Sequence, residues 1–273
     1  MTRYESVIWL ATVTFVVVAG CRERAATPVP EHRSSASPTL LAAAAPRPAL
    51  TAAPLPPPPD LRVPHAQKKI VPDGHFDVRA WGNSVNTHTL LDENGDGAVP
   101  VSEARFLWSE RELYVSFYAA DLDLHVESDR HDGPTLHNDG FTLVFYDGSA
   151  AKDVISVSVK GVVTDGRCPL AARDVDDPRC DLGWESHARV AADYDGTINQ
   201  LGDFDEEWNV ELAIPFAALV GHPGQPDERL SFSVERCEIA HDGRRECGSW
   251  GDAERRASLV LAPPGGRTSR ATR

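Results

Sequence analysis

One stretch of the sequence has the residue types and spacing of a calcium-binding loop. Residues 92–103 match the pattern D-x-[DN]-x-[DN]-G-x5-E at every specified position, which assigns Asp92, Asn94, Asp96 and Glu103 as oxygen ligands. Oxygen atoms at alternating positions can surround a hard cation, and the glycine permits the sharp turn. The sequence therefore predicts a calcium site. Because Glu103 is followed at once by a segment with strand character, a helix–loop–helix unit is not expected, and a solvated hairpin loop is the alternative.

Cys21 stands where a bacterial lipoprotein is modified. Residues 7–19 form an almost unbroken apolar run, which is too short for a comfortable membrane-spanning helix of about 20 residues. Small residues then precede Cys21, as they do at the cut site of a secretory signal. This arrangement resembles a lipobox, in which the cysteine is lipidated and becomes the mature N-terminus. Arg22 follows it, which by resemblance to Gram-negative lipoproteins favours the outer membrane. An uncleaved anchor with an incidental cysteine is the alternative.

Four further cysteines can form disulfides. An even number of cysteines in an exported chain favours disulfides, and four allow three pairings. Cys237 and Cys247 bracket an Asp-Gly turn, and Cys168 and Cys180 bracket a charged loop. We predict that each cysteine pairs with its nearest neighbour in the sequence. Zinc is the rival ligand, but neither pair has the short spacing of a zinc knuckle.

The charge of the chain is concentrated in its middle part. The whole chain has 27 basic and 41 acidic side chains, and residues 67–262 hold 18 and 37 of them. So acidic a unit would repel the phosphates of a nucleic acid, so nucleic-acid binding is excluded as a function. Sequence signatures of common hydrolases, metalloproteases and phosphate-binding loops are absent from the sequence. We therefore expect a protein that is not an enzyme.

The composition divides the chain into four parts. Residues 1–21 are the predicted lipoprotein signal, and residues 22–66 hold eleven of the 21 prolines. Four consecutive prolines favour an extended polyproline II conformation, so residues 22–66 are predicted to be a semi-rigid tether. Residues 67–262 are long enough to bury a hydrophobic core as one domain. Residues 263–273 are predicted to be a disordered tail.

Short apolar or alternating runs, separated by turn residues, indicate strands in the predicted domain. Residues 154–159 alternate strictly, as in a strand with one buried face. Many short strands with regular turn signals favour an all-β fold, an antiparallel β-sandwich of jelly-roll or immunoglobulin-like type. One short helix is expected at residues 216–220. The predicted strands are residues 104–108, 113–119, 141–146, 154–159, 208–214 and 230–234.

Several motifs follow one another along these strands. They are residues 73–77 with Trp81, residues 104–108 with 113–115 and Asp121, the pair Asn138 and Asp139, residues 208–211 with 214–216, and residues 249–250 with 259–261. In this order they resemble the motifs of family 9 carbohydrate-binding modules. The resemblance implies a β-sandwich related to the DOMON-like domains, which often contains calcium and in many members binds sugar.

The resemblance also implies a sugar site. Members that bind sugar ends hold them between two tryptophans, because the C–H face of a sugar packs well on an aromatic ring. Trp250 matches one of these positions, and Leu136 stands where the other tryptophan is expected. Ser156 lies on a strand where the family often presents charged or amide ligands to sugar hydroxyls. Because Leu136 replaces one half of the clamp, Trp184 is a candidate substitute platform.

The resemblance places calcium ligands near a second group of acids. Asp121 and Asp139 are the candidates, and three histidines lie in the same stretch, His125, His131 and His137. The related DOMON-like domains include haem-binding proteins. Ligation by methionine is excluded, because the single methionine is Met1. A histidine-ligated haem stays open as a less favoured alternative.

These observations lead to one expected function and a rival. We expect a non-catalytic domain that binds polysaccharide or oligosaccharide, is held at a membrane by a lipid on Cys21 and is associated with polysaccharide degradation. The rival is a structural or interaction sandwich of the same fold that has lost sugar binding. Since one fold supports many functions, the fold alone does not choose between them.

Overall fold

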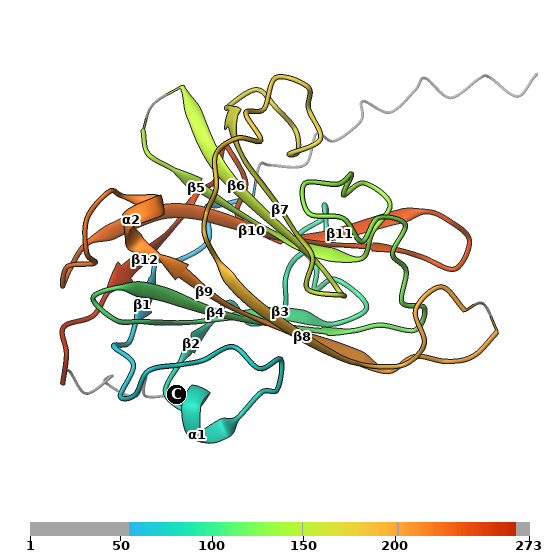
Figure 1. Cartoon of the computed structure of the whole chain (residues 1–273), viewed down its shortest axis with the longest axis horizontal. Coiled ribbons are helices and arrows are strands. Elements are labelled where there is room, and N and C mark those ends of the chain that lie inside the picture. Colours follow the sequence, from blue (N-terminus) through green and yellow to red (C-terminus); the bar gives the residue numbers. More distant parts are fainter. Residues whose placement is uncertain (1–54, 149, 201, 266–273) are drawn as a thin grey trace, which may run out of the picture. The chain divides into compact units, whose positions relative to one another are not determined.

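The computed structural model describes residues 55–148, 150–200 and 202–265, and these residues form a sandwich of two β-sheets (Figure 1). The seven-stranded sheet has the order β1-β12-β10-β5-β6-β7, with β11 paired to β10, and the five-stranded sheet has the order β2-β3-β4-β9-β8. All pairs are antiparallel except β1 with β12. The predicted all-β sandwich is therefore confirmed.

The strands of the seven-stranded sheet are β1 (Leu61–Val63), β5 (Gly140–Tyr146), β6 (Ala151–Ser158), β7 (Val163–Pro169), β10 (Arg229–Ile239), β11 (Arg245–Trp250) and β12 (Ala257–Leu261). Those of the other sheet are β2 (Val85–Asn86), β3 (Ser102–Trp108), β4 (Glu112–Ala120), β8 (Arg189–Asp195) and β9 (Glu207–Pro215). Two one-turn helices complete the fold, α1 (Val78–Trp81) and α2 (Phe216–Leu219). The short helix expected at residues 216–220 is α2.

Alternate side chains of each sheet fill the space between the two sheets. Phe117 of β4 stacks on Phe141 of β5 with 4.3 Å between ring centroids, and Phe106 of β3 meets Phe232 of β10 edge-on at 5.4 Å. Aromatic pairs in such geometries stabilise a core beyond the area that they bury. Since both pairs join one sheet to the other, they fix the face that each strand turns inward.

Three tryptophans expected in the core are buried. Trp81, Trp108 and Trp208 are all under 2% exposed. Each indole N–H has an acceptor: Trp108 donates to the carbonyl of Ala262, and Trp208 to Asp121. Trp81, at the end of α1, donates to Glu211 on the outer face of β9. A buried N–H without an acceptor would cost free energy, so these bonds allow the three large side chains to be buried.

Two disulfides join the cysteines in the predicted way. Cys168 at the end of β7 pairs with Cys180, and Cys237 of β10 pairs with Cys247 of β11. The second bond links directly opposite residues of an antiparallel pair. Each disulfide closes a short loop beside the seven-stranded sheet. The first holds the segment that follows Cys180, and the second holds β11, which carries Cys247.

The folded unit begins before residue 67, the boundary predicted from composition. Residues 61–63, assigned above to the tether, form β1 and pair in parallel with β12. Leu61 and Val63 are buried, so the end of the proline-rich segment closes one edge of the core. The signal, Cys21 and the tether up to residue 54 lie outside the described residues, as does the tail from residue 266. No helix within the described residues is long and apolar enough to cross a membrane.

We predict that Val63→Ala lowers the free energy of unfolding by about 2 kcal/mol, because it removes two methyl groups from a fully buried side chain. Denaturant unfolding followed by circular dichroism measures this change. Val71→Ala is the matched control, since Val71 is 62% exposed and its truncation leaves no cavity. Equal unfolding curves for wild type and Val63→Ala would show that β1 does not belong to the folded unit.

Candidate functional site

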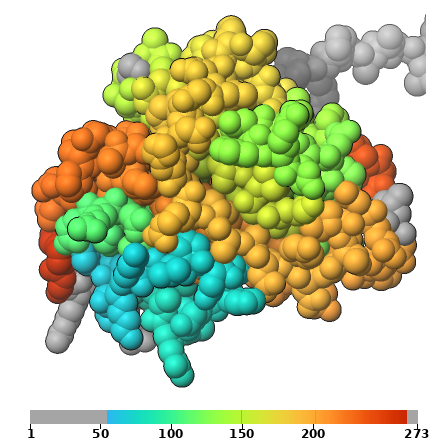
Figure 2. Space-filling model, in the orientation of Figure 1, coloured from blue at the N-terminus to red at the C-terminus, as the bar shows by residue number. Residues whose placement is uncertain are grey.

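A cavity of about 900 Å³ opens where β5, β6 and β7 approach α2 and the start of β10. On the face seen in Figure 2, the yellow segment before β8 lies against the orange segment around α2. The cavity is lined by aromatic side chains, among them Trp184, and by the charged side chains of Asp153, Arg167 and Glu185. Its size lies in the range of small-molecule sites, and its lining combines aromatic and aliphatic side chains with a comparable share of polar ones.

Trp184 is held in this cavity by the segment that carries it. Asp181 exchanges two backbone hydrogen bonds with Arg167 of β7, at 2.9 and 3.0 Å. On the other side of Trp184, the backbone N–H of Ser186 donates to the buried carboxylate of Asp165 at 2.8 Å. The Cys168–Cys180 disulfide fixes the same segment just before Asp181. Trp184 is half-buried, so part of its ring contacts the core and part lines the cavity.

Asp153 and Arg167 form a two-point ion pair beside the ring of Trp184. They lie opposite each other on β6 and β7, and the Nε and Nη2 atoms of Arg167 lie 2.7 and 3.1 Å from the two carboxylate oxygens. The carboxylate raises the pKa of Arg167. The guanidinium carbon lies 5.7 Å from the centre of the Trp184 ring, within the range of a cation–π contact. The pair therefore holds a charged fork at the edge of an aromatic face.

Of the residues that face this cavity, the sequence singled out only Trp184. Asp153 and Arg167 stand in short polar stretches that no motif marks. Their one sequence signal is position, since Arg167 precedes a paired cysteine and Asp153 directly precedes an alternating run. The register that sets them opposite each other is known only from the structure.

Ser156 and Leu136 lie apart from this cavity. Ser156 is buried on the outer face of β6 and lines a small recess, where Thr142 of β5 donates a hydrogen bond to its hydroxyl at 3.1 Å. Leu136 is 37% exposed, and its backbone N–H donates to Asp176. Neither residue lines the Trp184 cavity. The predicted sugar residues therefore do not form one site.

Trp250 does not present an open face, which disagrees with its expected role as a sugar platform. It is 8% exposed and packs into the core between the sheets. The reason is register: Trp250 lies opposite Val234 in the β10–β11 pair, and side chains opposite each other share a face. Val234 faces inward, so Trp250 does too. Its indole N–H has no acceptor among the described residues.

The predicted calcium loop is a tight hairpin in which the side chain of Asp92 accepts hydrogen bonds from backbone N–H groups of the same loop. Asp92 accepts hydrogen bonds from the backbone N–H groups of Asn94 and Asp96, both at 2.9 Å. Glu103 lies on the outer face of β3, where its carboxylate contacts Asn86 and forms an ion pair with Arg105. Within the described part of the chain, these four residues do not gather their ligand atoms. The arrangement does not fit the predicted ligand set, and calcium stays a prediction from the sequence.

Asp121 and Asp139 are buried at the other end of the core, where donors of the protein surround them. Asp121 accepts from Trp208 at 3.2 Å and from the buried guanidinium of Arg236 at 2.7 Å. Asp139 accepts from the backbone N–H groups of His125 and Ile239 at 2.5 and 2.6 Å. Since a guanidinium already neutralises Asp121 and both oxygens of Asp139 are engaged, these residues do not fit the expected calcium ligand set either.

Burial has a strong effect on the acidity of this pair. Burial raises the pKa of both carboxyl groups. The negative charge of Asp121 raises the pKa of Asp139 further, to about 8. Asp139 therefore holds a proton in the folded protein at neutral pH.

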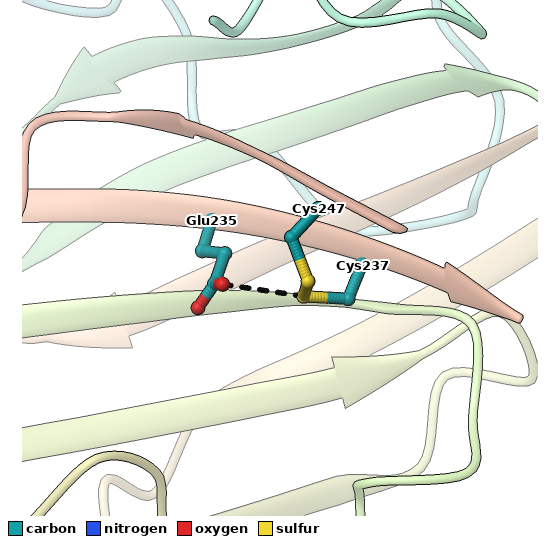
Figure 3. A group of neighbouring side chains, drawn as sticks. All are labelled: Glu235, Cys237 and Cys247. Atoms are coloured by element: carbon teal, nitrogen blue, oxygen red, sulfur yellow. Dashed lines mark hydrogen bonds between the residues drawn. A yellow bond between two sulfur atoms is a disulfide. The ribbon is translucent and has the colours of Figure 1, made fainter. Parts of the chain in front are cut away.

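Two other groups have the chemistry of metal ligands. Glu235 lies beside Cys237 and Cys247, with an oxygen 3.3 Å from the Sγ of Cys237, but both sulfurs are used in the disulfide and offer no thiolate (Figure 3). His131 gathers with Asp132 and Glu185, and its Nδ1–H donates to the carbonyl of Val163 at 2.8 Å, which raises the pKa of the ring. Among the described residues, neither His125 nor His137 belongs to such a group.

Comparison with known proteins shows similarity in structure. No protein-family profile matches the sequence, and a search of curated proteins found no significant match. A solved structure of a provisionally assigned carbohydrate-binding protein from Bacteroides uniformis is similar with a TM-score of 0.54 and 12% identity, over 74% of this chain and 98% of that chain.

Two further structures are family 9 carbohydrate-binding modules from Caldicellulosiruptor kristjanssonii. One, in complex with cellotriose, has a TM-score of 0.51 and 15% identity, over 78% of this chain and 97% of that chain. The other, in complex with glucose, has a TM-score of 0.51 and 13% identity, over 76% of this chain and all of that chain. The fold is thus the one that the sequence motifs implied.

We predict that the stability of the protein falls as the pH rises from about 5 to about 8 in the presence of a chelator. The folded state keeps a proton on Asp139 up to pH about 8, whereas an unfolded aspartate loses it near pH 4. The stabilisation is complete only below the unfolded pKa of about 4, and it is lost as the pH rises from there through the folded pKa. Melting temperatures across this range measure the slope.

Asp139→Asn replaces a titrating carboxyl group by an amide that does not titrate, so it should flatten the slope of melting temperature against pH. Altered hydrogen bonds in this variant would lower the melting temperature equally at every pH and would not change the slope. Asp227→Asn is the control, because Asp227 is exposed and pairs only with an exposed arginine. An unchanged slope in Asp139→Asn would show that Asp139 titrates normally in the folded protein.

Proposed function

We propose that the described unit binds a carbohydrate in the cavity beside Trp184 and performs no catalysis of its own. The observation that carries the proposal is the arrangement in that cavity: a half-buried tryptophan ring with a charged fork, Asp153 and Arg167, at its edge. A sugar has an apolar C–H face and a rim of hydroxyl groups. The ring provides a surface for the face, and the fork provides donors and acceptors for the rim.

The similar structures support this class of ligand. Two of them are carbohydrate-binding modules whose structures contain cellotriose and glucose. Carbohydrate-binding modules act by binding, which agrees with the absence of hydrolase signatures in this sequence. Because identity to these modules is only 13–15%, the position of the site in this chain is argued from its own residues.

We also propose that a lipid on Cys21 holds this unit at the outer membrane, on a tether rich in proline. The support is the sequence alone: an apolar run of signal length, small residues before the cysteine, and the arginine that follows it. A sugar-binding unit on such a tether would retain polysaccharide at the membrane, within reach of degrading enzymes.

We predict that Trp184→Ala lowers affinity for the bound glycan at least about tenfold, because it removes the apolar face, while Trp184→Phe keeps part of it. A glycan array identifies the ligand, and calorimetry measures the affinity. Circular dichroism checks that both variants fold, since Trp184 also contacts the core.

Tyr194→Ala is the matched control, since Tyr194 is a 42% exposed aromatic residue of β8 on the other sheet. Equal affinity of wild type and a folded Trp184→Ala variant would remove the proposed site. Wild-type protein that binds no glycan of the array would instead favour the structural or interaction sandwich.

We predict that a clickable fatty-acid analogue labels the wild-type protein in Gram-negative cells and does not label Cys21→Ala. The reason is that the lipid is joined to the cysteine thiol and the new N-terminus. Gel fluorescence after purification measures the label, and an unlabelled wild-type protein would contradict lipidation.

A further inference from the structure

We propose that the recess on the outer face of β5, β6 and β7 binds the anionic group of an acidic saccharide, either a carboxylate or a sulfate. This inference rests on the proposed function and narrows its ligand class. The recess is lined by the hydroxyl groups of Thr142, Ser156, Ser158 and Thr164, with two arginines at its edge, Arg130 and Arg245.

The charge of the recess is opposite to that of the surrounding domain. Residues 67–262 hold about two acids for each base, yet no acidic residue is among those that line the recess. Four other cavities of the described unit each include several acids in their lining. In a strongly acidic unit, a recess of this composition is the place where an anion meets the least repulsion.

Both arginines are available to a ligand. Arg244 is paired with Asp242 and Glu246, whereas no ion pair in the described part of the chain uses Arg130 or Arg245. Burial raises the pKa of Glu235 and the charge of Arg245 lowers it, but the Glu235 carboxylate lies beside the disulfide and does not line the recess.

The hydroxyl groups add neutral donors at the floor of the recess. Ser156 accepts a hydrogen bond from Thr142, and Ser158 accepts one from the backbone N–H of Val162 at 3.3 Å. Each serine hydroxyl therefore has its own proton to donate. Hydrogen bonds from hydroxyl and guanidinium groups to an anion are stronger than those between neutral groups.

Rigid elements carry both arginines. Arg245 begins β11, two residues before Cys247, and the disulfide partner Cys237 lines the recess. Arg130 lies in the loop before β5, where the buried side chain of Asn138 makes four hydrogen bonds to loop backbone groups, at 2.8–3.2 Å. The backbone on each side of the recess is therefore fixed before a ligand binds.

The size of the recess selects a small group. It encloses about 20 Å³, against about 900 Å³ for the Trp184 cavity, which is room for about one water-sized group. A sugar ring does not fit, but a carboxylate or sulfate that projects from a ring can reach the serine hydroxyls while the ring stays outside.

The test compares matched monosaccharides with the full chain by NMR titration: glucose, glucuronate and glucose 6-sulfate, with acetate and inorganic sulfate as free anions. We expect glucuronate or glucose 6-sulfate to bind about tenfold more tightly than glucose, and the one that does identifies the anionic group. Equal affinities for glucose and both acidic sugars would overturn the proposal. So would binding of acetate or sulfate as tight as that of the acidic sugar.

The double variant Arg130→Gln and Arg245→Gln should abolish the preference and leave glucose binding unchanged. Arg111→Gln is the matched control, because Arg111 is an exposed arginine in the turn between β3 and β4. An equal loss in Arg111→Gln would assign the effect to overall charge and overturn the proposal. Glucose binding that Trp184→Ala abolishes, without a preference for acidic sugars, would refute only this inference. A preference that needs the arginines, together with glucose binding that Trp184→Ala leaves unchanged, would refute only the Trp184 site.

Discussion

The contact of Phe141 with Phe117 and Trp208 is the constraint on which the sandwich depends. Phe141 belongs to one sheet, Phe117 and Trp208 to the other, and the ring centroids lie 4.3 and 5.1 Å apart. Because side chains alternate along a strand, fixing one inward residue fixes the face of every other residue of that strand. The same alternation that turns Phe141 inward turns Thr142 outward into the recess. The core packing therefore decides which residues can meet a ligand.

The polar end of the core follows from the same contact. Trp208 can be buried beside Phe141 because Asp121 accepts its N–H, and Asp121 is held by Arg236 of the opposite sheet. Breaking one partner of such a buried pair is costly, since the other charge remains without compensation. Asp121, one of the two acids that the sequence motifs associate with calcium, thus joins the two sheets through Arg236. Their burial explains the raised pKa of Asp139, which a surface acid in a loop would not show.

Patterns that depend on neighbours in the sequence predicted much of the fold. Alternation of apolar and polar residues predicted β6, and apolar-rich runs predicted β3, β4, β5, β9 and β10. The spacing of the cysteines predicted both disulfides. The strands β1, β2, β7, β8, β11 and β12 were not predicted. Of these, β7 and β8 have polar, largely exposed or glycine-containing sequences, and pairing with β6 and β9 stabilises them. The burial of Trp250 and the meeting of Asp153 with Arg167 depend on register between strands. Register is set by the packing of the whole sandwich, so no local pattern could reveal either of them.

Each disulfide lies where a segment that carries a residue of a proposed ligand site leaves the sheet. The disulfides therefore do more than stabilise a small domain. The segment after Cys180 carries Trp184, and the strand that carries Cys247 begins with Arg245. A loop that must present a rigid face loses affinity if it has to be ordered during binding. Crosslinks at these two positions remove that cost in advance. The sequence therefore places covalent constraints beside both proposed ligand surfaces. Among the described residues, no disulfide joins the two sheets of the core, which aromatic contacts hold together.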